Sequence, residues 1–306
     1  MGYLYLLCVA FMFSFGGTCV KLISPYFGPA YITFFRFFVG ICFLLLLKAG
    51  KRRPFCKEFF FCRRPLISWI LIGALAKWAN YLTENYALSH GPSYGNIIAQ
   101  PAQTIFVALA SVFLFKEKLP ARKLFCIALC IMGVLCISWN GRPLEVFFHE
   151  NLPMTGLFIL SGFCAGGHVL SQKMLAQHMD IIDSNLSMFL ISALLASITL
   201  IPGVAEGELS GIRPDIGCFA GILMFGFITG IGFYLNARAI LLVPFYIVPI
   251  IQSTMSIFAI LWGVLFFHEP ISACIVAGTA AFIIGLIGLQ LNPHSRQSRH
   301  KEHNNC

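Results

Sequence analysis

A polar stripe interrupts the apolar run between residues 66 and 88. Lys77, Asn80, Tyr81 and Glu84 follow one another at helical spacing, so a helix would present them along one side. An ionisable side chain within an apolar run long enough to cross a membrane is costly to bury, so a functional role is the first hypothesis for it. The stripe predicts a binding wall on which Lys77 holds an anionic group and Glu84 an amino or hydroxyl group. The alternative is a structural ion pair or relay between Lys77 and Glu84.

Five more polar residues lie inside other apolar runs and are candidates for the same site. Gln100 and Gln252 are deep amides that either bond a polar substrate or join helices to one another. His168 is either a proton-carrying site, because histidine titrates near neutrality, or a packing residue. Tyr234 and Asn236 lie on neighbouring faces of one run and complete the set of predicted substrate-binding residues.

The sequence lacks the motifs of several other classes of protein. It has no GxxxxGK[ST] phosphate loop, which argues against an ATP-driven pump within this chain. It has no HExxH or GxSxG motif and no carboxylate dyad, so a catalytic role is poorly supported. Its twelve cysteines include no CxxC pair and no Cys/His set with zinc spacing. We therefore expect no metal, no cofactor and no enzymatic activity.

The composition indicates that a lipid bilayer surrounds the elements that position these residues. Hydrophobic residues make up 58% of the 306 positions and charged residues 11%, whereas soluble domains carry about 25% charged residues. Because a helix needs roughly 20 apolar residues to cross a bilayer, we searched for runs of that length. Ten candidates emerge, over residues 3–23, 29–48, 66–88, 93–115, 122–140, 154–174, 184–202, 216–240, 244–267 and 273–291.

The positive charges predict the orientation of these spans. With ten spans, the basic residues of 48–65, of 116–123 and of the tail all fall on one side, which the positive-inside rule places in the cytoplasm. Both termini are therefore predicted to be cytoplasmic. The formal net charge of +9 is then mostly a topology signal, and we expect no nucleic-acid partner.

The chain also repeats itself after 152 residues. Residues 92–117 and 244–269 align without a gap and share ten identities in 26 positions, including Gln100 with Gln252. Because each repeat holds an odd number of spans, the second copy must insert upside down. Inverted repeats are common in alternating-access transporters, whose substrate site lies near the midplane between the halves. The repeat is broken at the polar stripe, where Lys77 corresponds to Thr229 and Glu84 to Asn236.

With these features the chain resembles the drug/metabolite transporter superfamily, and its EamA-type members in particular. The resemblance is carried by the ten spans, the repeat, Lys21, "TFFRF" at 33–37, "KEKL" at 116–119 and "HEPI" at 268–271. It implies a central cavity lined mainly by the first, third, fourth, sixth, eighth and ninth spans. It also implies a structural role for Arg36 in tying helices together.

The sequence therefore predicts an all-α integral membrane protein with ten transmembrane helices in two inverted five-helix repeats. Its parts are an EamA-like repeat (1–140), an external linker (141–153), a second EamA-like repeat (154–291) and a disordered cytoplasmic tail (292–306).

We expect a secondary transporter that moves a small polar metabolite, an amino acid or a similar zwitterion, across the cytoplasmic membrane by alternating access. Coupling to protons through Glu84 or His168, and a monomeric or homodimeric state, stay open. The alternatives are an exporter or flippase of drugs or amphipathic lipid-linked compounds, and, with less support, a membrane-embedded enzyme or a receptor.

Overall fold

Every element in the described part of the chain is helical in the computed structural model. The structure describes residues 1–51, 64–91, 95–115, 121–139, 141, 143, 145, 152–176, 178–205, 212–243, 251–252, 254–268 and 271–290. The first repeat holds α1 (Gly2–Ser14), α2 (Gly16–Ile23), α3 (Pro29–Gly50), α4 (Arg64–His90), η1 (Gly95–Ile98), α5 (Ala99–Phe115) and α6 (Ala121–Trp139). The second holds α8 (Leu152–Leu175), α9 (Ile181–Ala205), α10 (Ile216–Phe227), η3 (Ile228–Gly232), α11 (Phe233–Leu242), α13 (Met255–Phe267) and α14 (Ala273–Gln290).

Six helices in the described ranges are long and apolar enough to cross a membrane. They cover Gly2–Ile23, Pro29–Gly50, Leu66–His90, Leu152–Leu175, Ile181–Ala205 and Ile216–Leu242. Each coincides with one of the ten spans that the sequence predicts, so the membrane-embedded helical fold is confirmed while the count of ten stays a prediction. Residues 52–63 of the first basic loop, the tail (292–306), and Glu117 and Glu269 of the "KEKL" and "HEPI" motifs lie outside the described residues.

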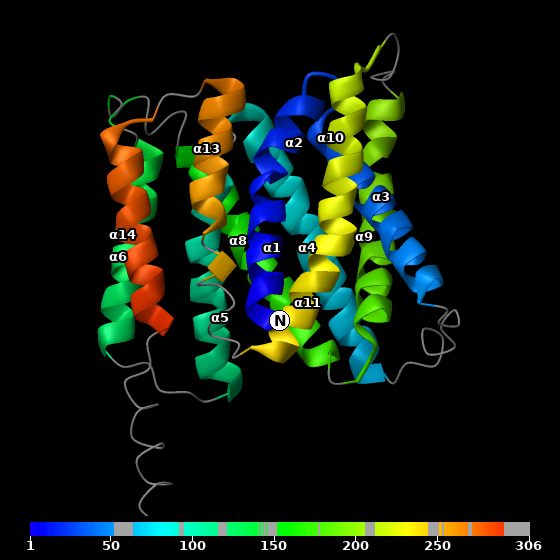
Figure 1. The fold of residues 1–306 in the computed structure, drawn as a ribbon, viewed down its shortest axis with the longest axis horizontal. Helices are drawn as coiled ribbons and strands as arrows, with labels where there is room; N and C mark the ends of the chain where they lie inside the picture. The colour runs from blue at the N-terminus through cyan, green and yellow to red at the C-terminus, as the bar shows by residue number, and fades with distance from the viewer. Residues whose placement is uncertain are drawn as a thin grey trace, which may run out of the picture.

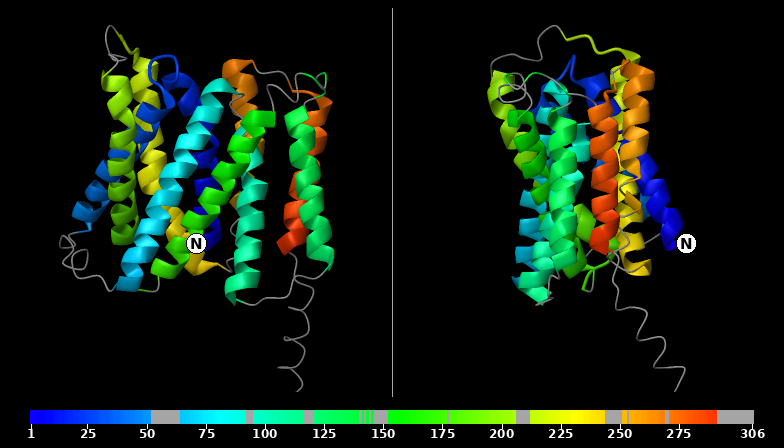
Figure 2. Two further views of the ribbon diagram at one scale, coloured as in Figure 1. Left: turned by 180° about the vertical axis from the view of Figure 1, so that it is seen from behind. Right: turned by 90° about the vertical axis from the view of Figure 1, so that its left-hand side faces the viewer.

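The helices stand side by side in one bundle, as Figures 1 and 2 show. The α6–α14 pair forms one end of the bundle and α3 with α9 the other, while α1, α4, α8 and α11 occupy the middle. The start of α1 and the end of α14 lie on the same side. Helix α1 and its repeat counterpart α8 run in opposite directions, as inverted repeats must.

Side-chain contacts also follow the repeat. Phe11 meets Phe258 edge to face at 5.5 Å between ring centroids, and their counterparts 152 residues away, Phe163 and Phe106, do the same at 6.2 Å. The Cys130 thiol lies 3.7 Å from the carbonyl oxygen of its own counterpart, Phe282. A contact between two equivalent positions is expected only near the pseudo-twofold axis, so the axis passes between α6 and α14 at this point.

Glycine permits the closest helix contacts. A Cβ atom on Gly162 of α8 would lie 2.2 Å from the Ala99 carbonyl oxygen of α5, and one on Gly226 of α10 would lie 2.2 Å from Val39 of α3. Real Cβ atoms do not approach so closely, so these backbones can touch only because the side chain is missing. This packing brings α3, α5, α8 and α10 around one central space.

Candidate substrate-binding site

A cavity of about 80 Å³ lies between the two repeats. Eight of the nine predicted substrate-binding residues line it: Lys77, Asn80, Tyr81, Glu84, Gln100, His168, Asn236 and Gln252. The other lining residues, which the sequence did not single out as a site, are Phe13, Gly16, Arg36, Asn96, Ala99, Gln103, Ala165, Val169, Phe233 and Met255. Taken together, the lining residues come from α1/α2, α4, η1/α5, α8, α11 and the 251–255 region, which correspond to the six expected cavity spans. Helix α3 contributes Arg36 in addition.

Lys77 is almost completely buried, with 4% of its surface exposed. Its Nζ atom donates to Asn80 Oδ1 at 2.9 Å and lies over the rings of Tyr81 and Phe233, 4.0 and 4.2 Å from their centroids. Aromatic faces attract a cation without consuming its hydrogen bonds. Lys77 is therefore held in place while two of its three N–H donors have no bond to a described residue.

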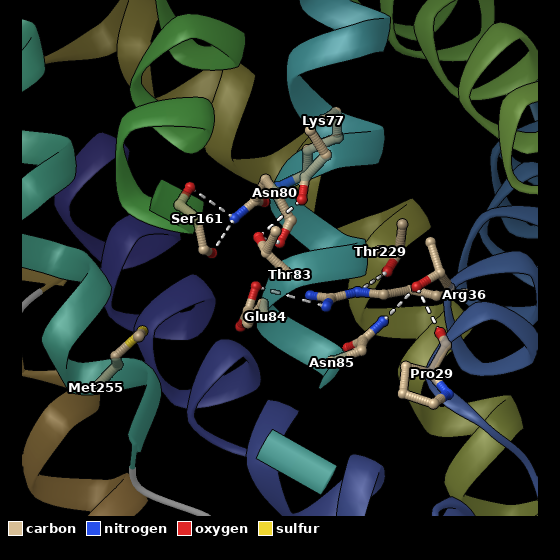
Figure 3. A network of polar contacts seen from close by, with 12 residues as sticks. Pro29, Arg36, Lys77, Asn80, Thr83, Glu84, Asn85, Ser161, Thr229 and Met255 are labelled. Carbon is tan, nitrogen blue, oxygen red and sulfur yellow. Dashed lines mark hydrogen bonds and ion pairs between the residues drawn. The ribbon is translucent and has the colours of Figure 1, made fainter. Parts of the chain in front are cut away.

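Asn80 joins the first repeat to the second at the wall of the cavity. Its Nδ2 atom donates to the Ser161 carbonyl oxygen at 3.0 Å and to Ser161 Oγ at 2.7 Å (Figure 3). Because Asn80 Oδ1 accepts from Lys77 as well, the amide fixes both α8 and the lysine. In the described structure Asn80 thus connects Lys77 to α8 and also lines the cavity.

Arg36 lines the cavity, although the sequence analysis expected only a structural role for it. It extends from α3 toward Glu84 on α4, with Nη1 3.9 Å from Oε2, and its Nε donates to Thr229 Oγ1 at 3.1 Å (Figure 3). Its guanidinium carbon lies 3.3 Å from the Tyr81 ring centroid and 4.0 Å from that of Phe225. The expected tie between helices is thus present, but the same side chain also lines the cavity.

Glu84 pairs with Arg36 and not with Lys77, the partner in the alternative that the sequence left open. The described contacts contain no ion pair between Lys77 and Glu84, and the carboxylate pairs with Arg36 instead. The distance of 3.9 Å is long for a charge-assisted hydrogen bond, and Arg36 Nη1 has no hydrogen-bond partner. The sequence did carry a signal, because Arg36 lies inside the predicted span 29–48 and a charge inside a span is a functional hypothesis by default.

The acceptor for Arg36 comes from a widened turn. Thr229 belongs to η3, a π-helical segment between α10 and α11, and such segments often mark functional sites. A Cβ on Gly230 would lie 2.6 Å from the Gly40 carbonyl oxygen, so α3 packs directly on this turn. Thr229 occupies the position in the second repeat that Lys77 occupies in the first. Because this position holds a threonine and not a second lysine, it can accept the hydrogen bond from Arg36.

The amides bond within the protein and still face the cavity. Gln252 Nε2 donates to Asn236 Oδ1 at 2.7 Å, and Gln100 Nε2 lies 3.7 Å from the Met255 sulfur. Both glutamines line the cavity, and neither bonds the other in the described contacts. The sulfur is a weak acceptor, so the Gln100 amide is the less firmly held of the two.

His168 is packed between aromatic rings and also lines the cavity. It is 0% exposed, stacks on Phe189 and contacts Phe233 edge to face. Nδ1 lies 3.1 Å from the Gly73 carbonyl oxygen. Because a carbonyl only accepts, Nδ1 carries a proton, and Nε2 of the neutral ring is an acceptor. That Nε2 atom has no hydrogen-bond partner, which makes His168 both a packing residue and an unsatisfied group at the cavity.

Tyr234 does not line this cavity. Phe233 and Asn236 share the cavity face of α11, and Tyr234 lies about 100° around the helix from Phe233. Its hydroxyl accepts from Arg238 at 3.1 Å and from Lys51. The predicted set therefore divides between the central cavity and a second pocket near the helix ends.

A cavity between inverted repeats is typical of membrane transporters, and the comparison with known families indicates the same class. The EamA-like transporter family matches residues 1–139 and 153–291, two ranges that begin 152 residues apart. The chain belongs to this family.

Similar proteins support the same assignment. The pseudopaline exporter CntI of Pseudomonas aeruginosa (strain UCBPP-PA14) is 23% identical over 290 residues, which is 94% of this chain and 95% of that protein. A solved crystal structure has a TM-score of 0.68 at 15% identity and covers 94% of this chain and 96% of its own. At that identity the crystal structure shows the fold alone.

Proposed function

We propose that this transporter moves a small zwitterionic metabolite with a carboxylate, such as an amino acid or an amino-acid-like compound, by alternating access. The observation that carries the proposal is the placement of Arg36 and Lys77 around one cavity, with Glu84 as the single carboxylate among the described lining residues. Two formal positive charges and one negative charge leave one positive charge unmatched (2 − 1 = +1). An anionic group on the substrate would neutralise it.

The geometry supports separate positions for the two ends of a zwitterion. The carboxylate would lie between Lys77 Nζ and Arg36 Nη1, which both have unused donors. Bonds to charged groups contribute about 1.5–3 kcal/mol each. The ammonium group would approach Glu84, whose ion pair with Arg36 is long at 3.9 Å. Gln100, Gln252 and the free His168 Nε2 would then bond the remaining polar atoms.

The size and polarity of the cavity disfavour drugs and lipid-linked compounds. Sites for drug-sized ligands are mostly apolar and measure about 300–1,000 Å³, whereas this cavity measures about 80 Å³ and carries charged and amide side chains. A drug-sized molecule would require the helices to move apart and the charges to lose their partners. A small polar substrate fits the cavity with much less rearrangement.

Two further observations bear on the direction and the location of transport. A relative named as an exporter favours export, and the positive-inside pattern favours the cytoplasmic membrane with both termini inside. Coupling to protons would use Glu84 or His168, the two cavity residues that the sequence singles out as possible proton carriers. Transport that ignores a pH gradient would remove this part of the proposal.

Ligand-induced stabilisation of the purified chain tests the substrate class. A ligand that binds the folded state at 100 times its Kd stabilises it by about 2.7 kcal/mol. We expect one or more free amino acids to raise the unfolding temperature, and the corresponding methyl esters, which lack the carboxylate, to have no effect.

Variants and controls make this binding test specific. Lys77→Gln should abolish the stabilisation, and Arg122→Gln should retain it, because Arg122 lies on α6 outside the cavity and bonds the Gly288 carbonyl oxygen. Equal stabilisation by acids and esters would show that no carboxylate is recognised.

A further inference from the structure

A second, larger pocket lies near the helix ends on the side where α1 begins. Its volume is about 350 Å³, and its lining residues are Lys51, Asp180, Ile181, Ile182, Tyr234 and Arg238. Lys51 directly follows α3, Asp180 directly precedes α9, and Arg238 lies four residues before the end of α11. A Cβ atom on Gly2 would lie 2.6 Å from Val243, so α11 ends beside the start of α1. The pocket therefore lies where α9 packs against both α3 and α11.

Two exposed cations converge on one buried hydroxyl in this pocket. Lys51 Nζ and Arg238 Nη1 both donate to Tyr234 Oη, the latter at 3.1 Å. Among the residues that the structure describes, neither cationic side chain has another hydrogen-bond partner. The hydroxyl uses only one donor of each cation. The remaining ammonium and guanidinium N–H groups can therefore still donate to an anion.

The described lining of the pocket carries one carboxylate against these two cations. Asp180 supplies it, and its Oδ1 atom accepts from the Ile182 backbone N–H at 2.9 Å. The charged lining residues leave a formal excess of one positive charge (2 − 1 = +1). Asp183, at the start of α9, pairs with Lys48 and so does not offset this excess. The pocket is therefore suited to a group that brings one negative charge.

The pocket contains the same charged set as the central cavity. Each has an arginine, a lysine, a tyrosine and one carboxylate among its described lining residues, namely Arg36, Lys77, Tyr81 and Glu84 in the cavity and Arg238, Lys51, Tyr234 and Asp180 in the pocket. In each, the lysine ammonium lies over the tyrosine ring, 4.0 Å from its centroid in the cavity and 4.2 Å in the pocket. A carboxylate that suits the cavity therefore also suits the pocket.

Helix α11 contributes to both sites. Phe233 and Asn236 line the cavity, whereas Tyr234 and Arg238 line the pocket. Arg238 lies two residues beyond Asn236, which is about 3 Å along the helix axis. The pocket thus lies beside the cavity and nearer to the helix ends on the side where α1 begins. A molecule that moves between the cavity and this side of the membrane would have a second pair of cations within reach.

We infer that this pocket is a second binding site for the transported molecule, which it holds by the carboxylate on the way into or out of the cavity. The identity of the ligand rests on the proposed function. Arginine binds a carboxylate through two parallel N–H bonds, and lysine adds a point charge. Because Lys51 and Arg238 are exposed, water weakens their attraction for the carboxylate. The pocket therefore binds less tightly than the buried cavity, as a transient site must.

Saturation-transfer NMR on the purified full chain tests this inference in the Lys77→Gln variant, in which the central site should no longer bind. The probes are a mixture of free amino acids and, separately, a mixture of their methyl esters. We expect at least one amino acid to bind this variant and its ester not to bind. Adding Lys51→Gln or Arg238→Gln should weaken the binding about threefold, and adding both about tenfold, as for exposed ion pairs. The single additions keep the test valid if the triple variant does not fold.

A matched control and the wild type separate this inference from the proposed function. Adding Arg122→Gln removes an exposed cation from α6 and should leave the binding unchanged. The inference alone fails if amino acids bind the wild type but not Lys77→Gln, if the esters bind as well as the acids, or if the Lys51 and Arg238 variants bind as Lys77→Gln does.

The proposed function alone fails if Lys77→Gln binds as tightly as the wild type while Lys51→Gln/Arg238→Gln binds no amino acid. The inference would hold in that case, because the pocket would be the site that recognises the carboxylate. If no amino acid binds even the wild type, both are wrong.

Discussion

At the scale of residues, the cavity holds its charges with few strong bonds. Arg36 and Lys77 both lie against the Tyr81 ring, and each also lies over a second aromatic ring, Phe225 for Arg36 and Phe233 for Lys77. Each keeps an unused donor toward the cavity. A buried polar group without a partner costs about 1–3 kcal/mol. A substrate that supplies the missing acceptor would remove this cost, and its binding would be more favourable by that amount.

Asn80 is the residue on which this arrangement most depends. Asn80→Ala removes the acceptor of Lys77 and both bonds to Ser161, so we expect the free energy of unfolding to fall by about 2–4 kcal/mol. Thr83→Ala is the control on the same helix, because the Thr83 hydroxyl bonds only backbone carbonyls of α4. Thermal unfolding of both variants measures the difference, and similar losses would mean that Asn80 positions nothing.

The stripe on α4 could be predicted from sequence because helical spacing alone places its members. Lys77, Asn80, Tyr81 and Glu84 share one face of any regular helix, whatever surrounds it. The partner of Glu84 could not be predicted, because it depends on α3 and on the π-helical turn at Thr229. The sequence could not predict that Tyr234 lines the second pocket rather than the central cavity, because the rotation of α11 after that turn decides which face meets the cavity.

At the scale of elements, two helix pairs that the repeat relates differ in regularity. Helices α4 and α8 pack together without interruption. Their counterparts are broken: α1 and α2 meet at Phe15, and α10 and α11 meet at η3. Both breaks lie beside the cavity, and the broken segments pack against each other. We expect this irregular pair to bend when the transporter changes state, while the regular pair moves as a unit.

Gly16 tests the role of the break between α1 and α2. A Cβ there would meet no atom closer than 3.9 Å, so Gly16→Ala should fold normally. Alanine stabilises a helix relative to glycine by about 1 kcal/mol, so the substitution should make bending at the break less favourable. We expect the kcat of transport to fall about fivefold, with a smaller change in KM. Gly167→Ala, in unbroken α8 with 3.5 Å of clearance, should leave the rate unchanged. Equal rates in the two variants would contradict bending at this break.

Gly162 tests the packing that forms the cavity wall. Gly162→Ala places a Cβ 2.2 Å from the Ala99 carbonyl oxygen and should force α5 and α8 apart, with a loss of about 1–3 kcal/mol or more in stability. Gly156→Ala, on the same helix, meets no atom within 4 Å and should be neutral or slightly stabilising. Thermal unfolding compares the two, and an equally stable Gly162→Ala would show that the helices are not in contact there.

At the scale of the whole molecule, the repeat relates sequence, fold and site. The 152-residue offset predicted the inverted halves, and the paired contacts of Phe11 with Phe258 and Phe163 with Phe106 reproduce it in space. The sequence could predict this because identical residues recur at a fixed offset. It could not predict the second pocket at the helix ends, since its lining residues Lys51, Asp180 and Arg238 share no spacing pattern along the chain.

The arrangement of the ends yields a topology prediction. A fluorescent reporter that matures only in the cytoplasm should give a signal when fused at residue 1 or at residue 306. Membrane-impermeant thiol reagents applied from outside should not label Cys56 or Cys62, which belong to the predicted cytoplasmic loop. A signal from one fusion only would mean an odd number of spans.

Transport by the purified chain in liposomes tests the central claim most directly. We would measure uptake of radiolabelled amino acids by wild type, by Lys77→Ala and by the control Arg122→Gln, at equal amounts of folded protein. The account predicts saturable uptake of at least one amino acid, a loss of about tenfold or more in kcat/KM for Lys77→Ala through the loss of one charge-assisted bond, and no change for Arg122→Gln. Uptake by Lys77→Ala at the wild-type rate would contradict it.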